Sequence, residues 1–294
     1  CTNVSIVGDV FCIPMVEELD ARAAAGDPVD LTSVRLVTSS GVMWSQPVKD
    51  RLLSHAREGG SALACFDALG SSEGVGFAGK QSSSGGTDTE TAKFELGPNA
   101  AVFTPDGRRV EPGSDEQGQL AVGGPIPLGY YGDPVKSAET FREVEGRRWS
   151  IPGDWATVAA DGTITLLGRG SVSINTGGEK VFPEEIEEEL KLLDAVNDVN
   201  VVGVPDPKWG SAVTAVVELV DGVEVSDADL VDALRGRLSG YKLPKHVVRV
   251  DRLYRSPNGK ADYKWAVGAA RDALGSDCTR ASRAVATQER STVR

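Results

Sequence analysis

The spacing of apolar positions changes along the chain and divides it into regions of different predicted structure. Residues 1 to about 94 mix stretches with helical spacing, "MVEELDARAAA" and "QPVKDRLLSHARE", with short apolar runs such as "SVRLVTSS". Helical stretches that alternate with short apolar runs are typical of a layered α/β fold. The front region is therefore predicted to be part of an α/β domain.

Residues 95 to 168 carry a different pattern, in which short strand-like runs are separated by turn signals. The segments "TPDGRRV" and "AADGTITLLG" each place an Asp-Gly pair where a hairpin would turn. This region is predicted to be a small β-rich subdomain.

Residues 169 to 268 return to a mixture of helices and strands. A helix is expected to begin near Pro183, and the apolar runs "VNVVGV" and "AVTAVVELV" predict strands. Ser226 and Asp229 form a capping box for a second helix, which Gly240 is expected to end. These elements predict a compact α+β unit.

The two ends of the chain carry weaker signals. Residues 269 to 294 lack a sustained apolar period and are predicted to be a flexible tail. The first residue is Cys1 rather than methionine, so we expect a fragment of a longer protein. No apolar run approaches membrane-spanning length and no charged-then-apolar leader opens the chain, so no membrane span is expected.

Length, charge and cysteine spacing narrow the class of protein. A chain of 294 residues with 40% hydrophobic content can form about two or three compact units. The formal net charge of −12 argues against nucleic-acid binding, which needs clustered positive charge. The four cysteines are far apart and form no CxxC pair, which fits the reduced thiols of a cytoplasmic protein better than a disulfide framework or a zinc site. They are Cys1, Cys12, Cys65 and Cys278.

Two features that often mark active sites have simpler structural explanations here. "GVGFAG" at 74–79 satisfies GxGxxG, but the polar stretch "KQSSSGGTDTE" follows where a dinucleotide fold requires a helix, so a loop is expected. His55 lies in a predicted helix and His246 at the start of a predicted strand, with no metal-ligand spacing nearby. Both histidines are expected to be structural.

The stretch "GRGSVSINTGGEKVFPEEIEEEL", residues 168 to 190, joins a glycine-rich turn to an acidic helix. Such a loop often binds an anion at the helix N-terminus, but three glutamates would repel a phosphate placed there. They are Glu184, Glu185 and Glu187. Gly177 and Gly178 are therefore expected to supply conformational freedom or close backbone approach, and the acidic helix a solvated face.

Three further stretches offer groups suited to binding a nucleotide. "ALGSSEGVG" puts Ser71, Ser72 and Glu73 on a turn, where hydroxyls would donate to phosphate oxygens and the carboxylate would bind Mg²⁺. Asp154 follows a Pro-Gly turn in "WSIPGDWATV", and its carboxylate could accept both hydroxyls of a ribose. Lys260 follows Asn-Gly in "RSPNGKADYKW" and could neutralise charge on a phosphate. Taken singly, each stretch also fits a plain turn or a solvated loop.

Over roughly residues 1 to 265, the order of these stretches resembles the adenylate-forming superfamily, specifically the acyl-CoA synthetases of the fatty-acid and steroid side-chain type. "ALGSSEG" is similar to the family's Tyr-Gly-x-Thr-Glu element, "GQLAVGGPIPLGYYGDPVKSAETF" to its Gly-Glu-Leu to Gly-Tyr-Tyr segment, and "PGDWATV" to its ribose-binding Gly-Asp. "GRGSVSINTGGEKVFPEEIE" resembles the hinge and thiol-access loop, "YKLPKHVVRVDRL" the penultimate motif and "SPNGKADYK" the catalytic-lysine motif. "TSSGVMW" at 38–44 resembles the substrate-pocket and nucleotide-edge segment.

The resemblance implies a fold and a set of residue roles. The fold would be the remainder of a large α/β adenylate-forming domain with a small β-barrel subdomain, followed by a mobile small α+β C-terminal domain. Ser72 would contact the α-phosphate of ATP and Glu73 the Mg²⁺. Asp154 and Arg169 would bind the ribose, and Lys260 would act on the reacting carboxylate and phosphate.

The same resemblance implies a second half-reaction with coenzyme A. The small domain would rotate about a hinge from Arg169 to Ser171 after the adenylate has formed. Gly177 and Gly178 would then line the passage for the pantetheine arm, and Lys180 would meet the phosphates of coenzyme A.

The chain also departs from the family pattern. Leu69 stands where an aromatic ring usually faces adenine, Gln119 replaces the usual Glu, and Ser171 stands where the hinge usually carries Asp or Lys. The Ser/Thr/Gly-rich phosphate loop and the front half of the large domain are missing. The fragment alone is therefore expected to have at most feeble adenylation activity.

The resemblance as a whole implies an acyl-CoA synthetase that uses ATP, Mg²⁺ and coenzyme A to activate a long-chain or steroid-derived carboxylic acid. Two alternatives stay open. One is a fatty-acyl-AMP ligase that loads a carrier protein, although the intact "NTGGEK" loop favours coenzyme A. The other is a non-catalytic remnant that binds a nucleotide or a partner. The sequence leaves undetermined which acid is used and whether the chain forms a homo-oligomer.

Overall fold

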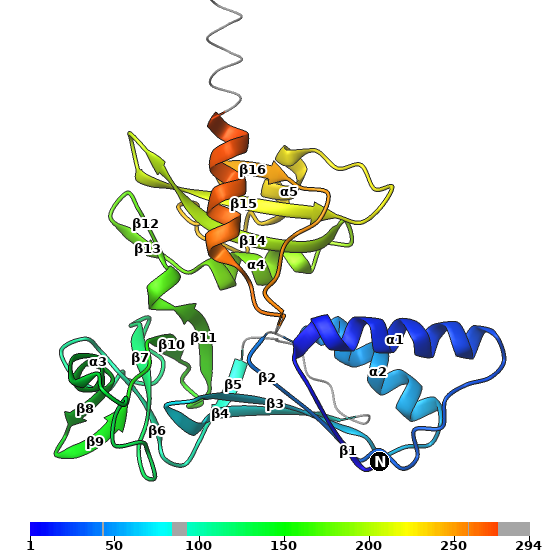
Figure 1. The fold of residues 1–294 in the computed structure, drawn as a ribbon, viewed down its shortest axis with the longest axis horizontal. Coiled ribbons are helices and arrows are strands. Elements are labelled where there is room, and N and C mark those ends of the chain that lie inside the picture. Colours follow the sequence, from blue (N-terminus) through cyan, green and yellow to red (C-terminus); the bar gives the residue numbers. More distant parts are fainter. Residues whose placement is uncertain (43, 84–92, 258, 276–294) are drawn as a thin grey trace, which may run out of the picture. The chain divides into compact units, whose positions relative to one another are not determined.

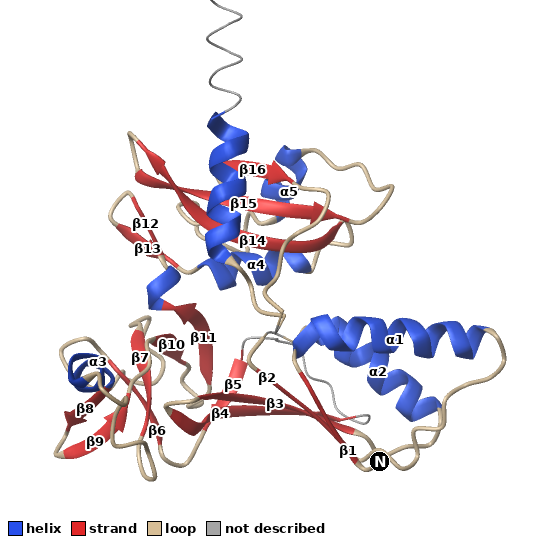
Figure 2. Cartoon of the chain, in the orientation of Figure 1, coloured by secondary structure: helices blue, strands red, loops and turns tan. Residues whose placement is uncertain are grey.

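The computed structural model describes residues 1–294 apart from 43, 84–92, 258 and 276–294. The chain divides into two compact units, of which the first takes in Cys1–Gly170 with residues 258–260 and the second takes in the remainder. Each unit has its own sheet and its own core (Figure 1, Figure 2). Cys278 and the final part of the predicted tail, residues 276–294, lie outside the described residues.

The first unit is built on one open sheet, which has eleven strands in the described part of the chain. The strand order is β1-β2-β3-β4-β5-β11-β10-β7-β9-β8, with β6 paired to β7. Strands β1, β2 and β3 run parallel, whereas β3 and β4 run antiparallel. The strands are β1 (Asn3–Ile6), β2 (Leu36–Ser40), β3 (Ala64–Ser71), β4 (Gly74–Ser83), β5 (Lys93–Leu96), β6 (Ala100–Phe103), β7 (Gly118–Val122), β8 (Phe141–Val144), β9 (Arg147–Ser150), β10 (Asp154–Val158) and β11 (Ile164–Arg169).

Two helices, α1 (Gly8–Ala24) and α2 (Gln46–Glu58), lie against the parallel strands β1 to β3 (Figure 1). Side chains from the helices and strands share one buried apolar cluster, which includes Cys12, Val37 and Leu52. Helix α2 spans the segment "QPVKDRLLSHARE" that the sequence pattern predicted. A short third helix, α3 (Pro134–Thr140), precedes β8. The predicted α/β character of the front region is confirmed.

The barrel expected within residues 95–168 is not closed in the described structure, and this expectation is corrected. The strands of this region continue the front sheet through β5, which pairs with β4 on one side and β11 on the other. The two predicted hairpin turns are confirmed. Gly162 lies in the turn between antiparallel β10 and β11, and Gly107 lies in a turn where Phe103 bridges Arg109.

Residues 74–79, expected to form a loop, instead begin strand β4. Phe77 and Ala78 are buried in a core cluster of the first unit, and Gly79 pairs with Ala68 of β3. The buried contacts and the ladder with β3 therefore outweigh the turn preference of the glycines in this segment.

The second unit is an α+β unit around the sheet β14-β15-β16, as predicted. Helices α4 and α5 share a buried cluster with Val199 and Val201 of β14. A helix over residues 263–275 packs on the alternate side chains of β14, among them Val202 and Val204. The elements are β12 (Ile174–Thr176), β13 (Glu179–Val181), α4 (Pro183–Lys191), β14 (Val196–Asp206), β15 (Gly210–Leu219), α5 (Asp227–Ala233) and β16 (His246–Arg249), preceded by the 3-10 turn η1 (Gly170–Val172).

Two predicted boundaries in this unit are wrong. Helix α5 ends at Ala233 rather than near Gly240, because Gly236 adopts a left-handed φ of +83° that a helix cannot accommodate. Residues 269–275, expected to begin a flexible tail, complete the last helix and bury Ala270 completely. Small alanines make the apolar period of this helix weak in the sequence although they pack tightly.

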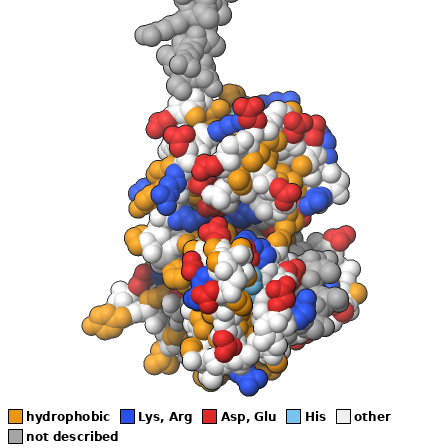
Figure 3. All heavy atoms as spheres, turned by 90° about the vertical axis from the view of Figure 1, so that its right-hand side faces the viewer, with side chains coloured by type: hydrophobic (Ala, Val, Ile, Leu, Met, Phe, Trp, Pro, Cys, Tyr) orange, Lys and Arg blue, Asp and Glu red, His pale blue; other side chains and the backbone are white. Residues whose placement is uncertain are grey.

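None of the described helices has the length and apolar character needed to span a bilayer. On the face seen in Figure 3, acidic and basic side chains are interspersed over the surface. The excess of acidic residues is therefore not expressed there as one acidic patch.

Candidate functional site

The turn that joins β3 to β4 carries two of the predicted nucleotide-binding residues. Strand β3 ends at Ser71 and β4 begins at Gly74, so Ser72 and Glu73 form the turn. Ser72 is exposed and Glu73 is partly buried. The Glu73 N–H donates to Ser71 Oγ at 3.2 Å and holds the turn closed. The turn thus offers a hydroxyl to solvent beside a sheltered carboxylate.

A tyrosine far away in the sequence holds the carboxylate of Glu73. Tyr130 Oη donates to Glu73 Oε1 at 2.7 Å. Burial opposes ionisation of Glu73, but hydrogen bonds from Tyr130 and Ser71 and the charge of Arg169 outweigh it, so the pKa of Glu73 is lowered. Burial and the facing carboxylate raise the pKa of Tyr130. Glu73 therefore stays ionised at neutral pH, as a carboxylate ligand for a cation must be.

Asp154 and Arg169 lie opposite each other on antiparallel strands. Asp154 begins β10, Arg169 ends β11, and the two are partners in the ladder. Arg169 Nε donates to Asp154 Oδ1 at 3.1 Å. The Asp154 side chain is 16% exposed and that of Arg169 is 54% exposed, so the carboxylate is held in place while the guanidinium reaches solvent. The charge of Arg169 also helps to lower the pKa of Glu73, so Arg169 acts electrostatically on both carboxylates.

Gln119 and Leu69, the residues that differ from the family pattern at these two positions, each contact neighbouring side chains. Gln119 of β7 lies opposite Trp155 of β10, and its Oε1 accepts from Arg142 Nη2 at 2.6 Å. The amide of Gln119 therefore keeps a hydrogen bond to a cation that a carboxylate would also make. Leu69 packs against the buried cluster that contains Phe77, so it contributes apolar packing in place of a ring.

The glycine-rich stretch of the second unit forms the hairpin β12–β13, which turns at Gly177 and Gly178. Their φ angles are +58° and +90°, in the left-handed region where other residues are strained. A Cβ built on Gly178 would meet nothing within 4 Å, so this position faces open space. The predicted conformational freedom is confirmed at both glycines. Lys180 lies in β13, with Nζ 6.0 Å from the ring centroid of Phe182.

Trp209, which no motif singled out, lies beside the tip of this hairpin. The Gly177 N–H donates to the Trp209 carbonyl oxygen at 2.9 Å, and a Cβ on Gly177 would stand 3.0 Å from the indole ring. Trp209 is 38% exposed, and the Nζ atoms of Lys208 and Lys245 lie 4.6 and 5.4 Å from its ring centroid. An exposed aromatic face beside two cations is suited to a ligand that combines a flat ring with negative charge. The only sequence signal was a tryptophan in a turn between two strands.

The helix that follows, α4, is not the uniformly solvated acidic face that the sequence predicted. Glu185 accepts from Lys242 Nζ at 2.6 and 2.8 Å. Glu187 is only 6% exposed, and its Oε1 accepts from the Val201 N–H at 2.7 Å. The prediction is wrong for Glu187, because β14 and the last helix supply hydrogen bonds that offset its burial.

Lys260 lies in the loop that precedes the last helix. Arg255 and Ala261 form an antiparallel bridge at the two ends of this loop. Lys260 groups with the first unit, as do Ser72, Glu73, Asp154 and Arg169, whereas Gly178 and Lys180 lie in the second.

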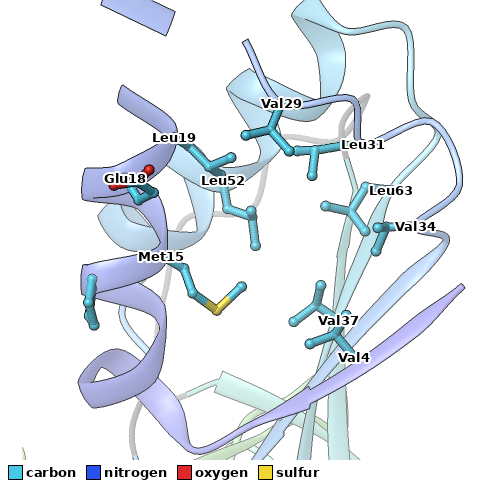
Figure 4. A pocket seen from close by; sticks show the side chains of 11 residues that line it. Val4, Met15, Glu18, Leu19, Val29, Leu31, Val34, Val37, Leu52 and Leu63 are labelled. Atoms are coloured by element: carbon cyan, nitrogen blue, oxygen red, sulfur yellow. The ribbon is translucent and has the colours of Figure 1, made fainter. Parts of the chain in front are cut away.

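An apolar cavity of about 490 Å³ lies elsewhere in the first unit, between α1, α2 and the strands (Figure 4). Met15 and Leu19 of α1 line one side, and Val34 and Leu63 line the other. Val34 precedes β2 and Leu63 precedes β3, so the cavity lies toward the opposite ends of these strands from the turn at Glu73. We assign it no part in the nucleotide site.

Several known proteins are similar to this chain in sequence or in fold. The family described as AMP-binding enzyme C-terminal domain matches residues 185–260. The 3-oxocholest-4-en-26-oate–CoA ligase of Rhodococcus rhodochrous is 46% identical over 268 residues, which are 90% of this chain and 47% of the relative. A medium/long-chain-fatty-acid–CoA/3-oxocholest-4-en-26-oate–CoA ligase of Mycolicibacterium smegmatis is 43% identical over 260 residues, which are 88% of this chain and 46% of the relative. The chain spans about half the length of the curated relatives it matches.

A solved structure of known function is also similar to this chain in fold. The o-succinylbenzoate CoA synthetase MenE of Bacillus subtilis, in complex with the acyl-adenylate OSB-AMP, aligns with a TM-score of 0.69 at 25% identity, over 90% of this chain and 50% of that chain. Over about 90% of its length, the chain is similar in sequence and fold to adenylate-forming enzymes. Within that class, its relatives are named as ligases that join fatty acids or 3-oxocholest-4-en-26-oate to CoA.

Proposed function

We propose that this chain is the part of an acyl-CoA synthetase that holds the nucleotide and carries the small C-terminal domain. The substrate would be a long-chain or steroid-derived carboxylic acid, activated with ATP and transferred to coenzyme A. The observation that carries the proposal is the ion pair of Arg169 with Asp154 in the first unit, and the charge of Arg169 also lowers the pKa of Glu73. The names of the relatives support the choice of coenzyme A as acceptor.

In the first half-reaction, Ser72 would donate its hydroxyl to the α-phosphate and Glu73 would hold Mg²⁺ through its ionised carboxylate. Both the exposed hydroxyl of Ser72 and the lowered pKa of Glu73 support these roles. Asp154, fixed by Arg169, would accept the ribose hydroxyls. Lys260 would neutralise charge on the carboxylate and phosphate as they react. When bound, Mg²⁺ would supply further charge neutralisation at the phosphates.

In the second half-reaction, coenzyme A would reach the adenylate past Gly177 and Gly178. The open space at Gly178 supports a passage for a narrow chain. The indole of Trp209, with Lys208 and Lys245 beside it, is suited to the adenine ring and phosphates of coenzyme A, which adds to the role proposed for Lys180.

Of the expected domains, we propose 1–94, 95–168 and 169–268, the last extended to residue 275 by the final helix. The family match to residues 185–260 supports the third, which would be the mobile small domain. The division of the chain after Gly170 supports a hinge between Arg169 and Ser171. We also propose a cytoplasmic location, for which the widely spaced cysteines are the support.

A second candidate function is nucleotide binding without turnover. A carrier-protein acceptor remains a variant of the main proposal, because such a ligase would use the same adenylating residues.

A chimera tests the proposal directly. The part of the Rhodococcus rhodochrous relative that this chain does not span would be joined in front of residue 1. The chimera would be given ATP, Mg²⁺, coenzyme A and a panel of fatty and steroid-derived acids, with acyl-CoA detected by mass spectrometry. We expect acyl-CoA from at least one acid and none from the Glu73→Gln chimera. If acyl-AMP forms without acyl-CoA, and its acyl group is transferred only to a holo-carrier protein, the carrier-protein ligase is favoured. If no acid gives an adenylate, the binding-only function is favoured.

A further inference from the structure

The loop that carries Lys260 is fastened at both ends by polar contacts that lie within the second unit. Arg255 precedes the loop and Tyr263 follows it. Arg255 pairs with Asp198 of β14, and Tyr263 pairs with Glu187 of α4. Arg255 and Tyr263 flank Lys260 in the stretch "RSPNGKADYKW", whereas their acceptors come from distant parts of the chain.

The contact before the loop is a two-pronged ion pair. Arg255 Nε donates to Asp198 Oδ2 and Arg255 Nη2 donates to Asp198 Oδ1, each at 2.5 Å. Both side chains are largely buried, at 14% and 17% exposure, and Lys191 Nζ also lies 2.9 Å from Asp198 Oδ1. Two parallel hydrogen bonds fix the orientation of a guanidinium as well as its position. The backbone at Arg255 is therefore held to β14.

The contact after the loop uses a buried carboxyl group. Tyr263 Oη donates to Glu187 Oε2 at 3.2 Å, while the Val201 N–H donates to Glu187 Oε1 at 2.7 Å. Burial raises the pKa of Glu187 to about 8, with the charge of Glu184 adding to the effect and Lys191 opposing it. A buried polar group is costly without partners, so the position of Tyr263 is tied to that of Glu187.

The backbone closes the loop between these two points. Arg255 and Ala261 form an antiparallel bridge immediately before the last helix. Asp262 Oδ1 then accepts from the Trp265 N–H at 2.9 Å and fixes the start of that helix. The described residues 256, 257, 259 and 260 therefore lie between two anchored positions.

The last helix also has apolar contacts that do not involve the hydroxyl of Tyr263. Ala266 and Ala270 are completely buried against the apolar face of β14 and β15, and these contacts dock the helix. What the hydroxyl adds is confined to the first turn of the helix, beside the loop.

We propose that Arg255 and Tyr263, with their acceptors Asp198 and Glu187, are positioning residues that hold the Lys260 loop in one conformation for adenylation. The proposal rests on the role of Lys260 given under Proposed function. A catalytic lysine on an unanchored loop would spend most of its time away from the reacting phosphate, and pre-orientation removes that loss.

The first test measures the order of the loop in the chain of residues 1–294 by hydrogen exchange with mass spectrometry. In Tyr263→Phe, exchange of peptides covering 255–262 should rise about tenfold, because the loss of one hydrogen bond to a buried carboxyl group is worth roughly that factor. Exchange of β14 and β15 should not change. Tyr254→Phe is the matched control, because Tyr254 is 50% exposed and lies just before the loop.

Conservative replacements separate positioning from general damage. Glu187→Gln keeps an oxygen for the Val201 N–H and a polar group for Tyr263, so it should retain most of the loop protection. Glu187→Leu should raise loop exchange as Tyr263→Phe does, and it should also raise exchange at Val201, whose N–H loses its acceptor. Arg255→Lys should raise exchange of the loop peptides, because a lysine keeps the charge but cannot make two parallel hydrogen bonds to Asp198. Unchanged loop exchange in Tyr263→Phe would overturn the proposal.

The second test uses the two half-reactions of the chimera. Tyr263→Phe should lower the rate of acyl-AMP formation about tenfold with little change in KM for ATP, and should spare conversion of supplied acyl-AMP to acyl-CoA. A loosened loop with normal adenylation, in a chimera that Lys260→Ala inactivates, would refute the positioning role and leave the proposed function intact. If Lys260→Ala leaves adenylation unchanged, the proposed role of Lys260 is wrong, and the anchors have no catalytic purpose.

Discussion

The buried carboxyl group of Glu187 makes the stability of the second unit depend on pH in a direction that the structure specifies. Burial is the main cause that raises its pKa from 4.5 to about 8. Between these two pH values the folded state keeps a proton that the unfolded state has released. Folding then binds a proton, so the free energy of unfolding must fall as pH rises through this window.

The size of the effect follows from the same two values. A rise from 4.5 to about 8 corresponds to at most about 5 kcal/mol, lost at a rate of up to about 1.4 kcal/mol per pH unit. Glu187→Gln removes the titrating group while keeping an oxygen for the Val201 N–H. The variant should therefore gain stability relative to the parent as pH rises from 5 to 8, by roughly 1 kcal/mol per unit.

The measurement is the free energy of unfolding of the second unit at several pH values from 5 to 8, taken from hydrogen exchange of β14 and β15 peptides after correction for intrinsic rates. Glu189→Gln is the matched control, because Glu189 lies on the same helix and pairs with Arg237 at the surface. Its pH profile should run parallel to that of the parent. If the Glu187→Gln profile also runs parallel to the parent's, Glu187 does not hold a proton in the folded state and the reasoning fails.

Three further outcomes are expected. Asn200→Leu should stabilise the second unit by about 1–3 kcal/mol in calorimetry, because neither polar atom of this fully buried side chain has a hydrogen-bond partner in the described structure; a lowered midpoint would contradict this. In the chimera, Lys260→Ala should reduce acyl-AMP formation by about 100-fold or more while sparing thioester formation from supplied acyl-AMP, and equal loss in both steps would refute the assignment. Gly178→Leu should slow thioester formation more than Gly178→Ala, which carries the same backbone strain at φ +90°, and equal effects of the two variants would assign this glycine to the backbone alone.

Local sequence signals were enough for several elements. The apolar period of "QPVKDRLLSHARE" corresponds to α2, and the Asp-Gly pair at 161–162 corresponds to the turn between β10 and β11. Pro183 opens α4, and the Ser226 side chain accepts from the Asp229 N–H at the start of α5. In these places the residues that decide the conformation are neighbours in the chain, so a short window contains the necessary information.

Contacts between distant segments account for what the sequence did not predict. Glu187 resembles the other glutamates of its helix, and only the approach of Val201 and Tyr263 allows it to be buried. Tyr130 is 57 residues from Glu73, so its hydrogen bond to that carboxylate leaves no local signal. The last helix was missed because alanines such as Ala270, which carry little apolar signal, pack closely against β14 and β15.

Acid-dependent exchange of labelled pyrophosphate into ATP tests the central claim most directly, because it reports adenylation alone. It would be measured for the chimera and for its Asp154→Asn and Lys260→Ala variants, with and without a long-chain or steroid-derived acid. The account predicts exchange that requires the acid and that both substitutions strongly reduce. Acid-dependent exchange that is indifferent to both substitutions, or no exchange with any acid, would contradict it.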